Sequence, residues 1–123
     1  MLKKLLTILV FCIGQAHADQ KEIRFIVTFP PGGPSDIVAR ILQPGLSKEL
    51  KSTVLVDNIS GVGGAIGTRA VISSDPVKVT LLIHSLALIT GSTVNNVSLY
   101  NPGDLIPIAI VGTIPLVLVS SRK

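Results

Sequence analysis

Short apolar runs alternate with amphipathic stretches along the chain. Three of the runs, at residues 23–29, 53–57 and 79–84, are rich in Ile, Val, Leu and Phe and contain few polar positions. Runs that are apolar at most positions, instead of at every second one, are typical of strands buried on both faces of a parallel sheet. Two later apolar runs, at residues 106–111 and 115–120, are predicted as further strands.

The stretches between the first three strands have the spacing of amphipathic helices. The apolar side chains of the first stretch, residues 35–50, are Val38, Ile41, Leu42 and Leu46. They fall at i, i+3, i+4 and i+8 and predict a helix with one face toward the core, and residues 65–74 predict a shorter helix of the same kind. Pro44 removes a backbone bond within the first helix, so we expect a kink there or a second helix that begins at Pro44.

The order of the predicted elements is strand, helix, strand, helix, strand. This order predicts an α/β fold with a mostly parallel sheet that is flanked by helices on both faces. In such sheets ligands bind at the carboxyl ends of the strands, where loops lead into the N-termini of helices. Both glycine-rich loops of the chain, FPPGGPSD and SGVGGAIG, fall at these ends.

The N-terminal segment MLKKLLTILVFCIGQAHA has the three features of a secretory signal peptide. Two lysines are followed by an apolar stretch at residues 5–13 and then by an A-x-A motif. The apolar stretch is too short to cross a bilayer, which takes ~20 residues. We therefore predict that residues 1–18 are a signal peptide with cleavage after Ala18, and that residues 19–123 are exported.

Removal of this signal peptide changes the composition of the remaining chain. Nine basic residues then stand against seven acidic ones, and the only cysteine, Cys12, is lost. Because the basic residues are scattered and aromatic residues are few, we predict no nucleic-acid partner. With His84 as the only histidine left, we predict no metal site, no disulfide and no cofactor.

The loop FPPGGPSD connects the first predicted strand to the first predicted helix. Three of its residues are prolines, which have no N–H to donate. The remaining backbone donors are Gly32, Gly33, Ser35 and Asp36. A stiff loop with glycine amides beside a helix N-terminus, which carries a partial positive charge, suits an anion such as a carboxylate.

Two interpretations of this loop remain open. In the first, it is a well-capped turn, with Ser35 as the helix N-cap, Asp36 in the first turn and Arg40 one turn further on. In the second, it is an anion site. The carboxylate of Asp36 would repel an anionic ligand, so we then expect it to turn away, to act through water or to meet an amino group of the ligand.

The second glycine-rich loop and the end of the third strand give weaker signals. SGVGGAIG lacks the glycine that a dinucleotide fingerprint needs at the position of Ile66, and the Gly-Lys-Ser/Thr of a phosphate-binding loop is missing. An exported enzyme that acts on carboxylates through Asp36, His84 or Ser85 is an alternative function. It is disfavoured because no nucleophile, base and orienting group can be paired from the sequence.

Four segments together resemble a known protein family. They are IRFIVTFPPGGPSDIVARIL, VLVDNISGVGGAIGT, VTLLIHS and IPIAIVGTIPLVLVSS. In this order and spacing they closely resemble the N-terminal part of the solute-binding proteins of tripartite tricarboxylate transporters, often called the Bug family.

The resemblance implies a periplasmic binding protein and not an enzyme. Members of the family have two α/β domains that close over a small carboxylated solute and deliver it to the membrane components of the transporter. The residues that the resemblance places at the ligand are Pro31, Gly32, Gly33, Ser35 and Asp36. Those that it places along the cleft are Gly63, Gly64 and Ser85.

The chain also departs from the family pattern. The family commonly has Asn-Arg-Pro-Gly before its double glycine, where this chain has Asn58-Ile59-Ser60-Gly61. Family chains are much longer, so residues 19–123 are expected to form a partial N-terminal lobe with an incomplete sheet and an exposed edge. We expect a truncated solute-binding protein. The alternatives are a truncated gene product that is marginally stable and binds no solute usefully, and a secreted protein that oligomerises through its bare edge.

Overall fold

The computed structural model of the chain describes residues 22–94, 99–115 and 117–122. The predicted signal peptide and its cleavage site lie outside these residues. The helices and strands are β1 (Glu22–Val27), α2 (Pro34–Leu50), β2 (Thr53–Asn58), α3 (Ala65–Ile72), β3 (Val79–Ile83) and α4 (Ala87–Val94). Two short 3-10 turns are η2 (Val62–Gly64) and η3 (Pro102–Asp104). Across the described ranges, no helix has the length and apolar character that a membrane crossing requires.

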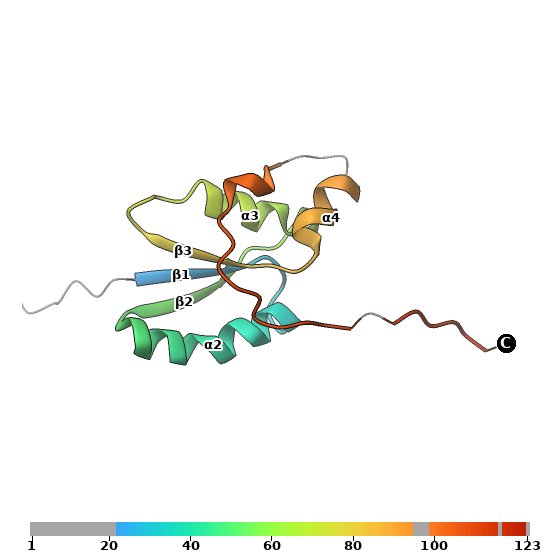
Figure 1. The fold of residues 1–123 in the computed structure, drawn as a ribbon, viewed down its shortest axis with the longest axis horizontal. Coiled ribbons are helices and arrows are strands. Elements are labelled where there is room, and N and C mark those ends of the chain that lie inside the picture. The colour runs from blue at the N-terminus through green and yellow to red at the C-terminus, as the bar shows by residue number, and fades with distance from the viewer. Residues whose placement is uncertain (1–21, 95–98, 116, 123) are drawn as a thin grey trace, which may run out of the picture.

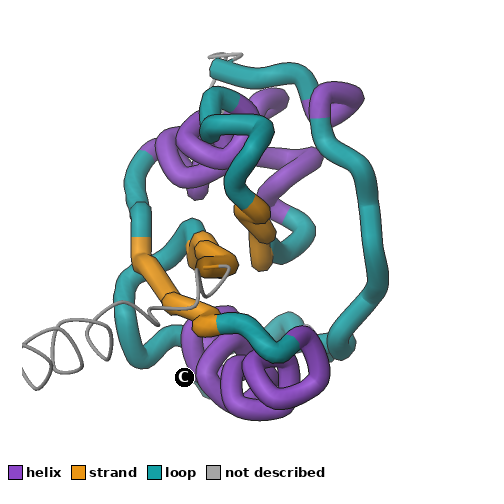
Figure 2. Tube along the Cα trace, turned by 90° about the vertical axis from the view of Figure 1, so that its left-hand side faces the viewer, coloured by secondary structure: helices purple, strands orange, loops and turns teal. Residues whose placement is uncertain are grey.

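The three strands form a parallel sheet in the order β2-β1-β3. α2 covers one face of the sheet, and α3 and α4 lie on the other face (Figure 1 and Figure 2). The predicted α/β fold class is therefore confirmed, with helices on both faces of a parallel sheet. α4 has no counterpart among the predicted elements, because its sequence ALITGSTV contains a glycine and β-branched residues that are poor helix formers.

The core lies between the sheet and α2. Its buried side chains are Ile23, Phe25 and Val27 of β1, Val54 of β2, Ile83 of β3 and Ala39 of α2. Val38, Leu42 and Leu46 pack against this cluster at partly buried positions, as the helical spacing predicted. Ile41 is instead exposed, because the buried face of α2 is centred on Ala39.

α2 runs as one helix through Pro44 to Leu50, so no second helix begins at Pro44. A proline inside a helix removes one backbone bond and crowds the preceding turn, at a cost of about 3 kcal/mol. Leu42 and Leu46 pack against the core on either side of Pro44. Their burial offsets the local cost, since helices in proteins are held mainly by tertiary packing.

The apolar runs after residue 105 form no strand in the part of the chain that the structure describes. Residues 106–115 and 117–122 pair with no strand, and Ile106 is 90% exposed. The prediction of strands at residues 106–111 and 115–120 was therefore wrong at the described positions. The composition of these runs favours strands, but a strand also needs a neighbour for its backbone N–H and C=O groups, and this segment has none.

We predict that Gly67→Ala and Gly45→Ala change the stability in opposite directions. A Cβ at Gly67 would lie 2.4 Å from the carbonyl oxygen of Ile59, and the backbone shift that relieves this clash should cost about 1–3 kcal/mol. Gly45 lies within α2 with nothing within 4 Å of an added Cβ, so alanine there should stabilise the helix by about 0.5–1 kcal/mol. Urea unfolding followed by circular dichroism measures both changes. An unfolding free energy that stays unchanged or rises in Gly67→Ala would contradict the close approach of α3 to the loop after β2.

Candidate functional site

The three strands end level with one another at the carboxyl edge of the sheet. Val27 of β1 pairs with Asn58 of β2 and with Ile83 of β3. Three loops therefore begin side by side: FPPGGPSD follows β1, SGVGGAIG follows β2, and a loop that begins at His84 follows β3. This is the edge at which parallel α/β sheets bind their ligands.

α2 begins without a side-chain cap. Its N-cap is Gly33 and its first residue is Pro34, so the prediction that Ser35 is the N-cap was wrong. Proline suits the first helical position because its φ is already helical and it has no N–H to satisfy. The N–H of Ile37 bonds to the carbonyl of Gly33 at 3.0 Å. The main-chain N–H groups of Ser35 and Asp36 form no hydrogen bond with any described residue, as is usual for the first turn of a helix.

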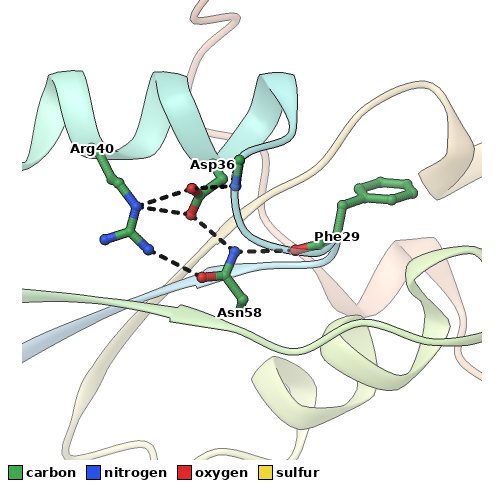
Figure 3. A network of polar contacts seen from close by, with 5 residues as sticks. Phe29, Asp36, Arg40 and Asn58 are labelled. Atoms are coloured by element: carbon green, nitrogen blue, oxygen red, sulfur yellow. Dashed lines mark hydrogen bonds and ion pairs between the residues drawn. The ribbon is translucent and has the colours of Figure 1, made fainter.

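The carboxylate of Asp36 points into the protein (Figure 3). The residue is only 3% exposed. Its Oδ2 accepts the main-chain N–H of Gly32 at 2.9 Å, and its Oδ1 accepts Nδ2 of Asn58 at 2.9 Å. Nε of Arg40 donates to both carboxylate oxygens, at 3.1 and 3.0 Å. Of the three arrangements expected for this side chain, the structure has the one in which it turns away from the outer surface of the loop.

Asn58 joins this network from the end of β2. Its Nδ2 also donates to the carbonyl of Phe29 at 3.1 Å, and its Oδ1 accepts Nη2 of Arg40 at 3.2 Å. The network therefore ties the end of β2 to the loop after β1 and to the first turns of α2. The hydrogen bonds to the carboxylate, that from Arg40 first among them, hold the pKa of Asp36 well below its usual range. The carboxylate stays ionised, and Arg40 balances its charge.

These internal bonds engage two of the four backbone donors that the sequence indicated. Gly32 donates to the Asp36 carboxylate, and Gly33 donates to the carbonyl of Pro30 at 3.4 Å. The donors left for an outside group are the N–H groups of Ser35 and Asp36 and the hydroxyl of Ser35. All three lie within the first turn of α2, where the helix dipole favours negative charge.

Gly64 and His84 pack against each other beneath the second loop. Gly64 has a φ of 94°, and a Cβ there would lie 2.4 Å from Nε2 of His84, so only glycine fits. Nδ1 of the ring lies 2.9 Å from the main-chain nitrogen of Ser85 and 3.2 Å from the carbonyl oxygen of the same residue, so the backbone of Ser85 holds this side of the imidazole. Nε2 and the hydroxyl oxygen of Thr28 are buried without a hydrogen-bond partner among the described residues. Burial lowers the pKa of His84, so the neutral ring adds no positive charge here.

The other predicted residues of the cleft lie at the surface of the same edge. Pro31, Gly63 and Ser85 are exposed, and the hydroxyl oxygen of Ser85 accepts the N–H of Ala87 at 3.4 Å. In the described ranges no hydrogen bond joins any of them to Ser35. α2 and α3 start on opposite faces of the sheet (Figure 1). The structure therefore brings the predicted residues to one edge but does not join them into a single set of contacts.

Sequence reasoning gave no role to Asn58 or Thr28. Asn58 is a polar residue at the end of an apolar strand, and its register with Val27 indicates contact with the first loop once a parallel sheet is assumed. The contact of Gly64 with His84 has no sequence signal, because it depends on how two loops pack. The described part of the chain holds no cluster of three His, Cys, Asp or Glu residues that could bind a metal ion.

In a parallel α/β sheet, the carboxyl edge with its helix starts is the place where ligands bind when the protein has one. The family model described as tripartite tricarboxylate transporter family receptor, TctC, matches residues 38–123, which is more than half of the chain. The chain therefore belongs to this receptor family, as the resemblance of its four segments to the Bug proteins predicted.

Individual relatives agree with the family match. Protein BugT of Bordetella pertussis is 41% identical over 106 residues, which cover 84% of this chain and 32% of that protein. A UPF0065 protein of Pseudomonas sp. strain P51 is 35% identical over 100 residues, which cover 80% of this chain and 30% of that protein. A solved structure described as a periplasmic transporter has a TM-score of 0.61 and 35% sequence identity, over 71% of this chain and 29% of that one. The chain spans about a third of the length of the curated relatives it matches.

We predict that Asp36→Asn destabilises the fold at neutral pH and less so in acid. The pKa of Asp36 is lower in the folded than in the unfolded chain, so its contribution to stability is present above about pH 4 and is lost as the pH falls toward the folded-state pKa. The difference in unfolding free energy between wild type and variant should therefore narrow below about pH 4. Urea unfolding at a series of pH values measures this difference.

The matched control for this prediction is Asp104→Asn, which removes an exposed carboxylate in η3. We expect it to leave the pH dependence of stability close to that of the wild type. The prediction would be contradicted if the difference in unfolding free energy between the wild type and Asp36→Asn stayed constant from neutral to acid pH. The ionised carboxylate would then not be what stabilises the loop.

Proposed function

We propose that this chain forms one wall of the solute-binding cleft of a periplasmic receptor, and that the start of α2 holds the carboxylate of a small solute. One observation carries the proposal. α2 begins without a side-chain cap, and the main-chain N–H groups of Ser35 and Asp36 in its first turn form no hydrogen bond with any described residue. Such groups carry the partial positive charge of the helix N-terminus and form a ready anion site.

The inward position of the Asp36 side chain supports this assignment. An exposed carboxylate at the helix start would repel an anionic solute. Here the carboxylate is buried and paired with Arg40, while the main-chain N–H of the same residue has no bond to the described part of the chain. Asp36 thus offers its backbone donor to the solute and keeps its negative charge inside the protein.

The loop FPPGGPSD makes the site rigid before a solute binds. Prolines restrict the backbone on both sides of the two glycines, and Gly32 is held in place by its bond to Asp36. A loop that is already ordered loses less conformational entropy on binding. The hydroxyl of Ser35 supplies a third donor, and each hydrogen bond to the charged carboxylate contributes about 1.5 kcal/mol.

In this proposal, the exposed residues at the same edge of the sheet line the path by which the carboxylate of the solute reaches the start of α2. They are Pro31, Gly63 and Ser85. Behind them, Gly32 and Gly33 shape the first loop through internal hydrogen bonds, and Gly64 shapes the second through its contact with His84. These glycines act on the backbone of the loops, and the solute meets the amides of the helix start.

The family match supports the remaining parts of the proposal, and the N-terminal sequence supports the export that it includes. Residues 19–123 form part of a first lobe, and a second lobe supplies the opposite wall of the cleft. Export directed by residues 1–18 places the receptor in the periplasm, where it delivers the solute to the membrane components of a tripartite tricarboxylate transporter, for which the family is named.

We infer binding and not catalysis at this edge. Nδ1 of His84 contacts the main-chain groups of Ser85, and its Nε2 is buried, so the imidazole is not placed to act as a base for the Ser85 hydroxyl. A hydrolytic site needs a nucleophile, a base and an orienting group in mutual contact. The receptors of the family are components of transporters, which supports the same inference.

We predict weak and specific binding of carboxylates by the chain alone. Three hydrogen bonds of about 1.5 kcal/mol each amount to about 4.5 kcal/mol, which corresponds to a dissociation constant of about 0.5 mM. In amide NMR titrations with acetate, succinate and citrate, the signals of Ser35 and Asp36 should shift most. Ser35→Ala removes one donor and should weaken binding by about threefold to tenfold.

The matched control for this titration is Ser73→Ala, which alters an exposed serine at the end of α3 and should leave the affinity unchanged. Succinamide, which has the same carbon chain without charge, should cause no shift at the start of α2. Shifts of similar size with succinamide, or shifts confined to other surfaces, would disprove a carboxylate site at the helix start.

A further inference from the structure

The turn after β2 has a strained backbone. Residues 61–64 all have positive φ values, from 47° at Val62 to 133° at Gly61. Glycine adopts such values freely, but Val62 is β-branched, and a positive φ is an outlier for residues of that class. Strain of this kind persists only where the surrounding structure holds it in place. The turn is therefore kept in its position by its neighbours.

The ring of His84 is the neighbour that packs against this turn. A Cβ at Gly64 would lie 2.4 Å from Nε2 of the ring and 3.1 Å from the Cβ of Thr28. The ring of Phe29 lies edge-on to the imidazole, with centroids 5.7 Å apart, and the backbone of Ser85 holds Nδ1. The imidazole is thus fixed between the first loop and the turn after β2.

Two polar atoms at this contact are buried without a partner. Nε2 of His84 and the hydroxyl oxygen of Thr28 form no hydrogen bond with any described residue. Most buried polar atoms in proteins do have a partner, so two exceptions at one contact need an explanation. Neither atom is accessible from outside, so a segment that packs on the outer surface cannot supply the missing bonds. A movement of the turn away from the ring would give both atoms access to water.

Among the described residues, no charged side chain forms an ion pair or a hydrogen bond with the ring of His84. β3, α4 and η2 carry no charge, and the charged residues of β1, Glu22 and Arg24, lie in its first half. Arg69 of α3 is exposed, as is Asp104 of η3, which lines the same cavity as His84. Burial therefore dominates, and it lowers the pKa of His84 below its usual value.

We propose that the imidazole of His84 is a pH-sensitive latch, which holds the turn at residues 61–64 against the sheet when neutral and releases it when protonated. The protonated ring carries an N–H at Nε2, which is buried against the backbone of Gly64 without an acceptor. A charge in such a place requires contact with water. Release of the turn provides that contact and also relieves the strain at Val62.

The latch is separate from the anion site proposed at the start of α2. It lies on the β3 side of the first loop, and its test needs no solute, so the two proposals can fail independently. Only its effect on a ligand rests on the proposed function, in which Gly63 of this turn lines the path of the solute. The carboxylate of Asp36 remains ionised when His84 titrates, because its pKa is held well below the usual range.

NMR of the isotope-labelled protein from about pH 7.5 to about pH 4.5 tests the latch, since this range includes the ordinary pKa of histidine. Ring signals that are missing in His84→Gln identify those of His84. At neutral pH, nuclear Overhauser contacts should join the ring protons of His84 to the α-protons of Gly64. These contacts should be lost as the ring takes up its proton, and the amide signals of residues 61–64 should shift with the same midpoint.

His84→Gln keeps a polar side chain that cannot be protonated. In this variant the amide signals of residues 61–64 should not titrate with that midpoint. The unfolded chain takes up the proton of His84 more readily than the folded chain, because burial lowers the folded-state pKa. The wild type should therefore lose stability relative to His84→Gln as the pH falls from about 6.5 to the folded-state pKa.

Gly64→Ala places a methyl group against the ring nitrogen and should release the turn at neutral pH. The pKa of His84 should then rise to about 6.5, its ordinary value. The matched control Gly32→Ala introduces alanine at a similar φ of 82°, with nothing within 4 Å of the added Cβ, and should keep the ring contacts and the midpoint of the wild type. Asp104→Asn, which removes the carboxylate that lines the same cavity, should also keep them.

Three results would overturn the proposal. The contacts between His84 and Gly64 could persist after the ring is protonated, the ring could stay neutral over the whole pH range, or the amide signals of the turn could titrate equally in His84→Gln. Each of these results is read from the wild type and His84→Gln alone, so the test stands even if Gly64→Ala does not fold.

Discussion

The ionised carboxylate of Asp36 is buried at the end of a three-stranded sheet, and a buried charge is tolerated only where partners compensate for the loss of water. The partners here come from three separate segments: the N–H of Gly32 from the first loop, the guanidinium of Arg40 from α2 and the amide of Asn58 from β2. Because each must lie within hydrogen-bond distance of one group, the network constrains how the loop, the helix and the strand lie relative to each other. Loss of Arg40 would leave the buried carboxylate without its counter-charge, which costs more than a surface ion pair contributes.

This constraint also explains how a helix can begin without a cap. The absence of a side-chain cap usually costs about 1 kcal/mol, and an acidic side chain in the first turn normally recovers part of this by facing the free amides. In α2 the acidic side chain faces the opposite way and bonds to Arg40 instead. The helix start is held by the network behind it, and its amides at Ser35 and Asp36 are left without partners in the described structure. An anion can bind at such a helix start only if the negative side chain is buried on one side of the loop and the free amides lie on the other.

The sequence was sufficient to predict the strands and helices that follow from local residue patterns, and to predict helices on both faces of the sheet. Continuous apolar runs predicted a parallel sheet, and the helical spacing predicted the packing of Val38, Leu42 and Leu46. The sequence was insufficient to predict features that depend on contacts with residues far away in the chain. The runs after residue 105 have the composition of strands but no neighbour to pair with, and Pro44 is tolerated because α2 packs on both sides of it.

The same distinction applies to the candidate site. The spacing of prolines and glycines located the loop between β1 and α2 and indicated four backbone donors, of which Gly32 and Gly33 form internal hydrogen bonds in the structure. It could not reveal that Gly32 donates to Asp36, because this depends on the direction of one side chain. Nor could it assign Asn58, whose role appears only when the ends of β1 and β2 are level.

The two edges of the sheet are connected to the first loop by different contacts. On the side of β2, Asn58 holds the loop through the carbonyl of Phe29 and the carboxylate of Asp36. On the side of β3, the link is His84, whose ring lies edge-on to the ring of Phe29 with centroids 5.7 Å apart and packs against Gly64. The ring of Phe29 is thus in contact with the β3 side while its carbonyl is fixed by the β2 side. The polar network that positions the amides of α2 lies on the other side of β1, so the two sides of the sheet hold the first loop through separate contacts.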